Sequence, residues 1–444
     1  MTDRPVAERS RRRSLVLVAG VFVTAIAVAL GVVLSGSGEH QSGGPGFGGH
    51  VSAAEAARYR AVSRLLEARS AAIVHRDRAA FLATVDPESK AFRRTQSRMF
   101  TDVAPVPIAS WSYDLTAGGR RPPSDASKYR ASVWAPSYFV VHYRIAGFDT
   151  KATTLQQYPT FVERDRRWYL ASLSDYASRR LVSATDIWDY GPVKVLRRAG
   201  VLVLGAPSQL ATMTEVAREV PPAIRQVSAV WGTGWSRRVV VIVPDTTSEM
   251  GLIDDFQGPL GNIAALTSAE VSSSAGHPTP VGDRITINPV NWPLLSNVGA
   301  AVVIRHELTH VATRAVTGAQ TPTWLSEGFA DYVGFLDAHV SVTVAAGGLQ
   351  QLVRSGHAPR ALPTNHDFKS SNSQLAAQYE AAWLACRYIA QRFGQSTLVR
   401  FYRAVGTSTS RSQVALGDAL HNLLNMNLGR FVAQWRRYVV AELR

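Results

Sequence analysis

The stretch that most constrains the fold of this chain is His306-Glu307-Leu308-Thr309-His310, with sixteen residues between its last histidine and Glu327. Residues four apart lie on one face of a helix, so both imidazoles can point at one metal ion. The intervening Glu307 lies beside the pair, where it can reach an attacking water rather than the metal. This H-E-x-x-H pattern is typical of zinc hydrolases, although a buried helix whose histidines are four apart by chance is the alternative.

A zinc site of this kind needs a third protein ligand, and residues 321–336 offer one. Gly318 can terminate the first helix, and Thr323 can cap a second helix beginning at Trp324. That helix presents Glu327 and Asp331 on one face. If it folds back, Glu327 completes the metal site and Asp331 accepts a hydrogen bond from a ligand imidazole. Read separately, Glu327 is an acid favoured by the helix N-terminus and Asp331 a solvated charge.

The HELTH motif and the WLSEGFADY segment together resemble the gluzincin branch of zinc metallopeptidases, especially compact bacterial members with an E-G-x-A-x-Y signature. The resemblance is clear over about residues 285–335, and the spacing of sixteen is slightly shorter than in the best-known members. It implies one Zn²⁺ ion bound by His306, His310 and Glu327. It also implies Glu307 as general base and Asp331 as the partner of a ligand histidine.

The same resemblance implies an oxyanion-stabilising tyrosine and a substrate-binding edge strand. Tyr379 is the predicted tyrosine, with His366 as a weaker substitute, although Tyr379 also begins a buried helical stripe that includes Cys386. Residues Ile285, Thr286, Ile287 and Asn288 are the predicted edge strand, and an ordinary core strand is the alternative. Arg284 or Asn291 could bind polar groups of a peptide.

The chain begins with a basic tail (1–13), an uncharged apolar run from Ser14 to Leu34 and a Gly/Ser-rich linker (35–50). About twenty apolar residues span a bilayer, and the arginines before the run keep the N-terminus in the cytoplasm. We therefore expect a single-pass membrane anchor with the rest of the chain exported. A cleaved signal peptide, which would release a secreted protein, is the alternative.

Two folded parts follow the linker, and both indicate an α+β fold. Residues 51–180 combine a helix ending at Asp86 with strands at 108–115, 137–148, 158–165 and 167–175, the last two forming a hairpin. This pattern resembles the cone-like nuclear-transport-factor-2 fold. Residues 185–444, the metallopeptidase-like part, have predicted strands at 194–205, 237–245 and 283–289 and become mostly helical after Gly299. The tail 431–443 is expected to pack on these helices.

The resulting prediction is a membrane-anchored, extracytoplasmic zinc metallopeptidase that hydrolyses peptide or protein substrates. The formal net charge of +15 carries no arginine- and aromatic-rich block after residue 13, so no nucleic-acid partner is expected. Two alternatives stay open: a non-catalytic envelope scaffold that retains the fold, and a binding protein that works through residues 51–180. No G-x-M-E-N exopeptidase signature precedes the metal motif, which favours an endopeptidase. Substrate and oligomeric state are not predicted.

Overall fold

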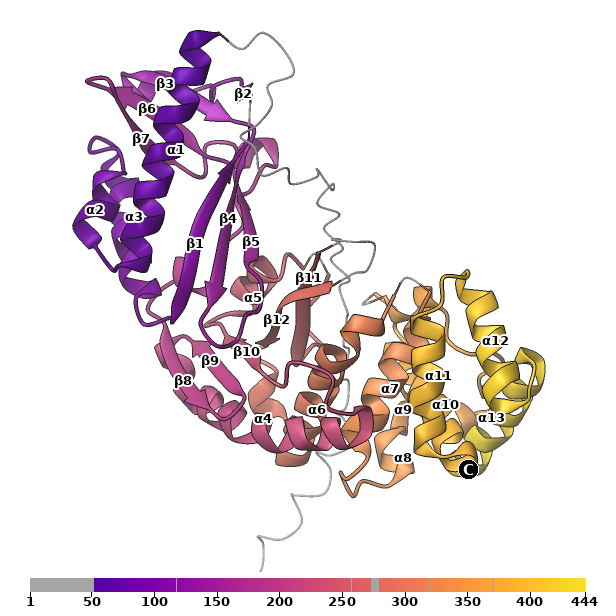
Figure 1. The fold of residues 1–444 in the computed structure, drawn as a ribbon. Helices are drawn as coiled ribbons and strands as arrows, with labels where there is room; N and C mark the ends of the chain where they lie inside the picture. The colour runs from indigo at the N-terminus through magenta and orange to yellow at the C-terminus, as the bar shows by residue number, and fades with distance from the viewer. Residues whose placement is uncertain (1–51, 117, 257, 273–278, 319, 370) are drawn as a thin grey trace, which may run out of the picture.

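The computed structural model describes residues 52–444, apart from 117, 257, 273–278, 319 and 370 (Figure 1). The predicted tail 1–13, anchor 14–34 and linker 35–50 lie outside the described residues. Among the described residues, no helix combines the length and apolar character needed to cross a bilayer.

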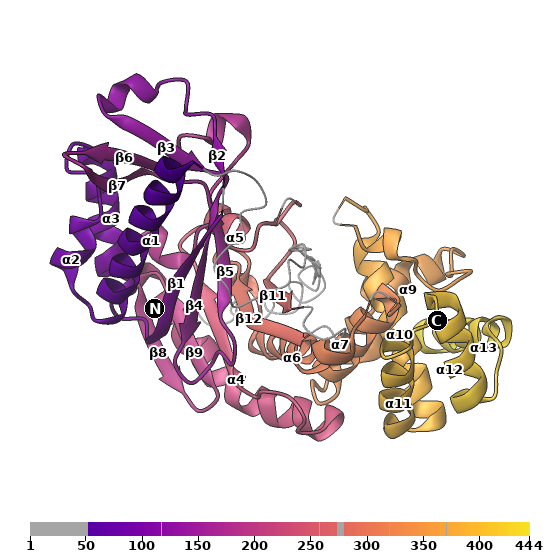
Figure 2. The ribbon, with the colours of Figure 1, turned by 45° about the horizontal axis from the view of Figure 1, so that its top comes forward.

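The N-terminal part packs helices beside two antiparallel sheets, with strand orders β1-β4-β5 and β2-β3-β6-β7 (Figures 1 and 2). Its helices are α1 (Ala53–Val74), α2 (Arg78–Ala83) and α3 (Lys90–Val103). Its strands are β1 (Ile108–Leu115), β2 (Gly119–Arg120), β3 (Ser132–Pro136), β4 (Phe139–Ile145), β5 (Thr153–Gln157), β6 (Thr160–Arg164) and β7 (Arg167–Ser172).

Most predicted strands of this part are present, whereas its first helix is broken. The predicted strand 108–115 coincides with β1, and β6 and β7 form the predicted hairpin through Asp165 and Arg166, both at positive φ. A continuous helix to Asp86 is wrong. The chain turns at Arg76, with φ 58°, and the side chain of Asp77 accepts a hydrogen bond from the Ala80 amide to begin α2.

The second part begins with a five-stranded sheet in the order β11-β12-β10-β9-β8. Its strands are β8 (Lys194–Arg198), β9 (Val201–Gly205), β10 (Val239–Val243), β11 (Ala265–Ser272) and β12 (Thr279–Ile287). The predicted single strand 194–205 is instead a hairpin, because the chain reverses at Gly200, with φ 77°. Helices α4 (Leu210–Trp231) and α5 (Thr247–Ile253) connect the strands.

The predicted helical C-terminal half is present. It contains α6 (Asn297–Thr313), α7 (Thr323–Phe335), α8 (Val342–Ala345), α9 (Gly347–Arg354), α10 (Leu375–Phe393), α11 (Gln395–Gly406), α12 (Ser412–Leu424) and α13 (Leu428–Leu443). As predicted for the tail, α13 buries one stripe against these helices, namely Phe431, Trp435, Val439 and Leu443. The chain is thus an α+β protein whose helical half follows a mixed sheet.

Alternate residues of the central strands enter two different hydrophobic cores. Val203 and Val241 pack toward the helices of the C-terminal half, whereas Leu204 and Ile242 pack against the aromatic core of the N-terminal part. The N-terminal part is also joined to this sheet by Arg284 of β12, whose guanidinium donates two hydrogen bonds to Asp149, at 2.8 and 2.9 Å. The sheet is therefore covered on both faces, and the N-terminal part covers one of them.

The predicted substrate strand Ile285–Asn288 is not an edge strand, and this prediction is wrong. Strand β12 lies between β10 and β11, so Ile285 pairs with Val241 on one side and with Thr267 on the other. All four residues are buried. Arg284 is held by Asp149, and the Asn291 amide donates to backbone carbonyls of residues 260–263, so both side chains serve the fold. Strand β11 forms this edge of the described sheet.

Candidate metal centre

Helix α6, which carries the two histidines, lies at the centre of the second part. Its N-terminus is capped by Ser296, whose Oγ accepts a hydrogen bond from the Gly299 amide at 3.1 Å. From Val302 to Thr313 every residue is buried, because the helix packs against α4, α7 and β11. A buried helix holds its polar side chains in fixed directions.

Helix α7 carries the two acids and begins one residue earlier than predicted. Its cap residue is Pro322, and the Thr323 amide donates to Oδ1 of Asn365 at 3.0 Å, so Thr323 itself is not the cap. Helix α6 ends at Thr313, followed by a 3-10 turn at Arg314–Val316, so it stops before the predicted terminator Gly318. The two helices nevertheless fold back on each other as predicted.

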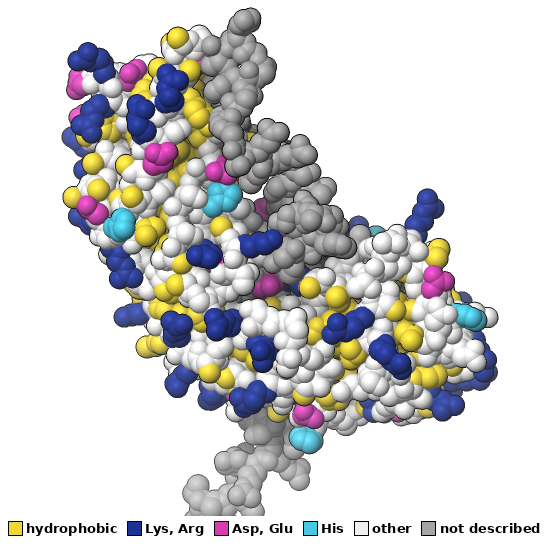
Figure 3. Space-filling view, in the orientation of Figure 1, with side chains coloured by type: hydrophobic (Ala, Val, Ile, Leu, Met, Phe, Trp, Pro, Cys, Tyr) yellow, Lys and Arg dark blue, Asp and Glu magenta, His cyan; other side chains and the backbone are white. Residues whose placement is uncertain are grey.

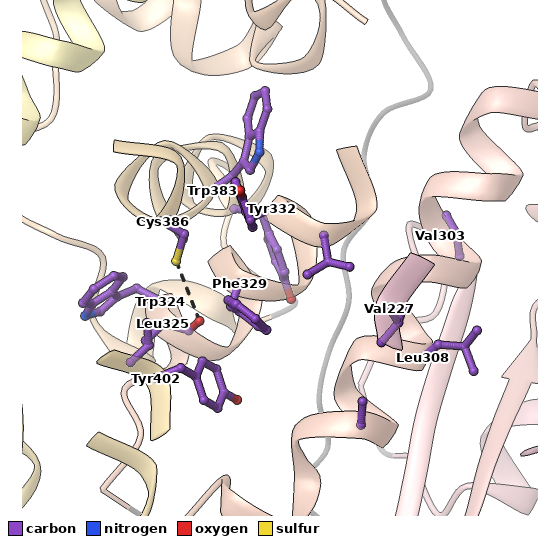
Figure 4. Close-up of a cluster of buried hydrophobic side chains, with 14 of the residues drawn as sticks. Val227, Val303, Leu308, Trp324, Leu325, Phe329, Tyr332, Trp383, Cys386 and Tyr402 are labelled. Carbon is purple, nitrogen blue, oxygen red and sulfur yellow. Dashed lines mark hydrogen bonds between the residues drawn. The ribbon is translucent and has the colours of Figure 1, made fainter. Parts of the chain in front are cut away.

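Glycines allow α7 to lie very close to both neighbouring helices. A Cβ atom added to Gly328 would lie 2.2 Å from the carbonyl oxygen of Ala382 in α10, and one added to Gly334 would lie 3.1 Å from that of Val302 in α6. Around α7, Phe329 packs against Tyr402 with ring centroids 5.0 Å apart, and Cys386 lies beside the Leu325 carbonyl (Figure 4). This packing fixes the rotation of α7, and with it the direction of Glu327 and Asp331.

The side chains of His306, His310 and Glu327 meet at one point. The two Nε2 atoms are 2.8 Å apart, and Glu327 Oε2 lies 3.5 Å from that of His306 and 3.4 Å from that of His310. These residues form the only group of potential metal ligands found within the described part of the chain. The predicted third ligand therefore lies beside the histidine pair.

This donor set fits a zinc ion. Ligand atoms at 2.0–2.1 Å from a tetrahedral ion are roughly 3.3 Å apart, close to the two longer distances, with the histidine pair somewhat closer. Glu327 is completely buried, yet neither of its carboxyl oxygens has a hydrogen-bond partner among the described residues. A buried carboxylate without such a partner is costly unless it binds a cation. His306, His310 and Glu327 are therefore the residues that would hold zinc.

Asp331 orients one of the two imidazoles, as predicted. Its Oδ1 lies 2.7 Å from Nδ1 of His306. With a metal ion bound, the ring would keep its hydrogen on Nδ1, facing Asp331, and would offer the lone pair of Nε2 as the ligand. Asp331 is itself buried, so this contact is shielded from water.

The charges around the site favour a cation. Burial lowers the pKa of His306, but Asp331 and Glu327 outweigh it and raise that pKa to about 10. Burial raises the pKa of Glu327, but His310 and His306 hold it below its ordinary value. The pKa of Asp331 is raised by burial against the pull of His306. The carboxyl groups of Asp331, Glu327 and Glu307 thus act on two buried imidazoles, and this arrangement stabilises a positive ion.

Glu307 has one occupied and one unoccupied carboxyl oxygen. Thr267 of the edge strand β11 donates its hydroxyl hydrogen to Oε2, whereas Oε1 has no partner in the part of the chain described. Burial raises the pKa of Glu307, and the two histidines partly oppose it. Sequence reasoning did not find Thr267, because no motif marks it and only the pairing of β11 beside α6 brings it to the glutamate.

The other residues singled out from the sequence are Tyr379, His366 and Cys386. The buried side chain of Tyr379 stacks edge-on against Phe368, with ring centroids 5.1 Å apart. It lines one pocket together with Asp331. His366 is exposed in the 3-10 turn Asn365–Phe368. Cys386 is fully buried, and burial raises the pKa of its thiol, in keeping with its prediction as a packing residue.

Comparisons with known proteins give only distant matches. The sequence matches no protein-family model, and no curated protein matches it. Similar solved structures include native yeast LTA4 hydrolase, at 14% identity and a TM-score of 0.35, covering 63% of this chain and 43% of that one. An M1 zinc metallopeptidase from Deinococcus radiodurans bound to a Tyr-Ser-Ala substrate has 16% identity and a TM-score of 0.32, covering 74% and 70%. The chain is thus distantly similar to M1 zinc metallopeptidases.

Proposed function

We propose that this protein is a zinc metallopeptidase that hydrolyses peptide bonds with Glu307 as general base. The observation that carries the proposal is the convergence of two imidazole nitrogens and one buried carboxylate at mutual distances of 2.8–3.5 Å. A non-catalytic scaffold would need neither this donor set nor an additional carboxylate beside it. Glu307 is such a carboxylate, and its Oε1 has no partner among the described residues.

The chain's own residues supply most of the proposed mechanism. A zinc ion bound here supplies Lewis acidity and lowers the pKa of the attacking water towards ~7. Glu307 accepts a proton from that water at Oε1 and delivers it to the leaving amine. Asp331 keeps His306 in one tautomer and orientation throughout. From the resemblance of the sequence to gluzincins, we assign stabilisation of the oxyanion to the hydroxyl of Tyr379.

The extended substrate is proposed to pair with β11 rather than with β12. Strand β11 has one strand neighbour in the described sheet, and its Thr267 contacts Glu307. A peptide added along this edge would therefore lie beside the general base, as in other cases of β-augmentation. An extended mode of binding does not require a free terminus, which is consistent with an endopeptidase.

We further propose that the catalytic part is exported and remains attached to the membrane by residues 14–34. The support is the uncharged run itself and the four arginines among residues 9–13 that precede it. The cone-like identity of residues 51–180 also remains a proposal, supported by the helix and antiparallel sheets of that part.

Zinc analysis and peptide cleavage by the full-length protein test the proposed function. We expect one zinc per chain and cleavage of members of a peptide library. Glu307→Gln should keep the zinc and lose about 10²–10⁴-fold in rate. Full turnover by Glu307→Gln would overturn the base assignment. A folded protein that takes up no zinc would instead favour the scaffold.

A further inference from the structure

Positively charged side chains surround the β8 edge of the central sheet. They belong to Lys194, Arg197, Arg198, Arg225, Arg237 and Arg238. All six side chains belong to exposed residues. We call this surface the β8 basic face. In Figure 3, Lys and Arg side chains gather over β8, β9 and α4, at the lower left of the molecule.

Contacts within the fold bring the five arginines together from three separate segments, whereas Lys194 lies at the other end of β8, opposite Gly205. The hairpin β8–β9 carries Arg197 and Arg198 beside its turn at Gly200. The Val239 amide donates to the carbonyl of Gly200, which places Arg237 and Arg238 next to that turn. The side chain of Ile224 lies against Gly200, so Arg225 of α4 follows at the same end of the sheet.

Little negative charge offsets this face. Residues 190–214 and 220–244, which supply all six cations, contain no aspartate or glutamate. None of the ion pairs among the described residues involves any of the six. The nearby Asp149 is already bound by Arg284. Such a face attracts an anionic surface.

We propose that the β8 basic face docks the protein onto anionic lipid headgroups. A membrane is favoured over a protein or nucleic-acid partner because residues 14–34 are predicted to hold this chain at a bilayer, where even weak contacts are made at high effective concentration. The six residues also lie around an edge of the sheet.

Docking through this face has a consequence for the metal centre. In the sheet order β11-β12-β10-β9-β8, the docking strand is at one edge and β11, with Thr267 beside Glu307, is at the other. Contact at β8 therefore directs the metal centre away from the lipid. The face does not depend on the proposed catalysis, because none of its residues belongs to the site.

The test places the full-length protein in nanodiscs of neutral lipid, or of the same lipid with 30% phosphatidylglycerol. Ala199→Cys puts a fluorophore at the exposed turn of the β8–β9 hairpin, and Thr409→Cys puts one at an exposed position between α11 and α12 in the helical half. Energy transfer to an acceptor on the lipid headgroups reports proximity, and the buried Cys386 stays unlabelled. We expect transfer from position 199 to rise at least threefold with anionic lipid, to exceed that from position 409, and to be lost in 1 M salt.

Charge reversal distinguishes docking at this face from general attraction. Arg197→Glu with Arg198→Glu should abolish the rise, whereas Arg392→Glu with Arg437→Glu, an equal charge change on exposed residues of α10 and α13, should preserve it. Equal transfer in both lipids, or equal loss in both double variants, would overturn the proposal. If soluble polyglutamate changes the fluorescence of the label at position 199 while anionic lipid has no effect, the partner is an acidic protein instead. The membrane proposal then fails.

Discussion

The hydroxyl group of Thr267 donates a hydrogen bond to Oε2 of Glu307, while Oε1 of the same carboxylate has no partner among the described residues. One oxygen is thus fixed by the edge strand, and the other is left for an attacking water. If the proposed chemistry is correct, Thr267 acts by positioning the base without contacting zinc.

Replacing Thr267 by valine should slow the chemical step and leave binding intact. Loss of one hydrogen bond to a charged group corresponds to about 1.5–3 kcal/mol, or roughly 10–100-fold in kcat. We expect zinc content and KM to stay unchanged, and Thr267→Ser to restore most of the rate. Steady-state kinetics of the three proteins decide this, and a valine variant with the parent kcat would exclude the role.

Asp331→Asn should weaken zinc binding. The asparagine cannot hold the His306 tautomer as the carboxylate does, and losing such a partner typically costs 10–100-fold in metal affinity. Competition with a chelator measures the affinity. The matched control is Asp337→Asn, on an exposed residue just beyond α7, which should leave it unchanged. Equal affinities for all three proteins would contradict the proposed orientation of His306.

Gly328→Ala should destabilise the protein, because the added methyl carbon would lie 2.2 Å from the Ala382 carbonyl oxygen. Overpacking of this kind costs about 1–3 kcal/mol or more, and here it also displaces the neighbouring Glu327. Gly417→Ala in α12 is the control: apart from its own helix backbone and chain neighbours, no atom lies within 4 Å of its added Cβ, so a gain of about 0.5–1 kcal/mol is expected. Urea unfolding of both variants tests the difference, and similar midpoints would argue against the tight α7–α10 contact.

Glu380 should make the protein less stable as the pH rises from about 4.5 to 7. Burial raises the pKa of this carboxyl to about 7, although the amides of Leu349 and Gly348 oppose the shift. Between its unfolded and folded pKa values the folded protein holds a proton that the unfolded chain has lost, so stability falls with pH by about 3 kcal/mol in total. Below that window the penalty is absent.

Glu380→Gln removes the titration, because glutamine stays neutral, and its single carbonyl oxygen can still accept one of the two backbone hydrogen bonds. We expect the variant to gain stability relative to the parent between pH 5 and pH 8, measured by urea unfolding at a fixed zinc concentration. Parallel pH profiles for the two proteins would show that the carboxyl is charged throughout.

Local signals in the sequence predicted the histidine-bearing helix and the acid-bearing helix, because both patterns repeat every four residues. Their convergence needed the close approach of α7, which depends on Gly328 and Gly334 and on packing that no local pattern reports. Helix α4 carries Pro221 and Pro222, which normally end a helix, yet it continues to Trp231 under tertiary packing. The edge strand could not be predicted either, because it depends on the pairing of β11 with β12, which no local pattern reports.

Of the two hairpin turns, one can be predicted from the sequence and the other cannot. Asp165-Arg166 stands between two alternating segments, and this pattern predicts the hairpin turn that is present. Within residues 194–205, by contrast, the apolar run around Gly200 concealed the reversal, and one long strand was predicted where two antiparallel strands exist. A single glycine in a strand-like pattern is ambiguous, because it is compatible with a bulge, a turn or a close packing contact.

The sheet shared by the two cores has a practical consequence. Leu204 and Ile242 face the N-terminal part, so a shortened gene product starting near residue 185 would expose an aliphatic layer to water. Such a fragment should be insoluble or quickly degraded even if it retained every zinc ligand. Any mutation that unfolds the N-terminal part should therefore also unfold or inactivate the second part. The two parts should fold and unfold together.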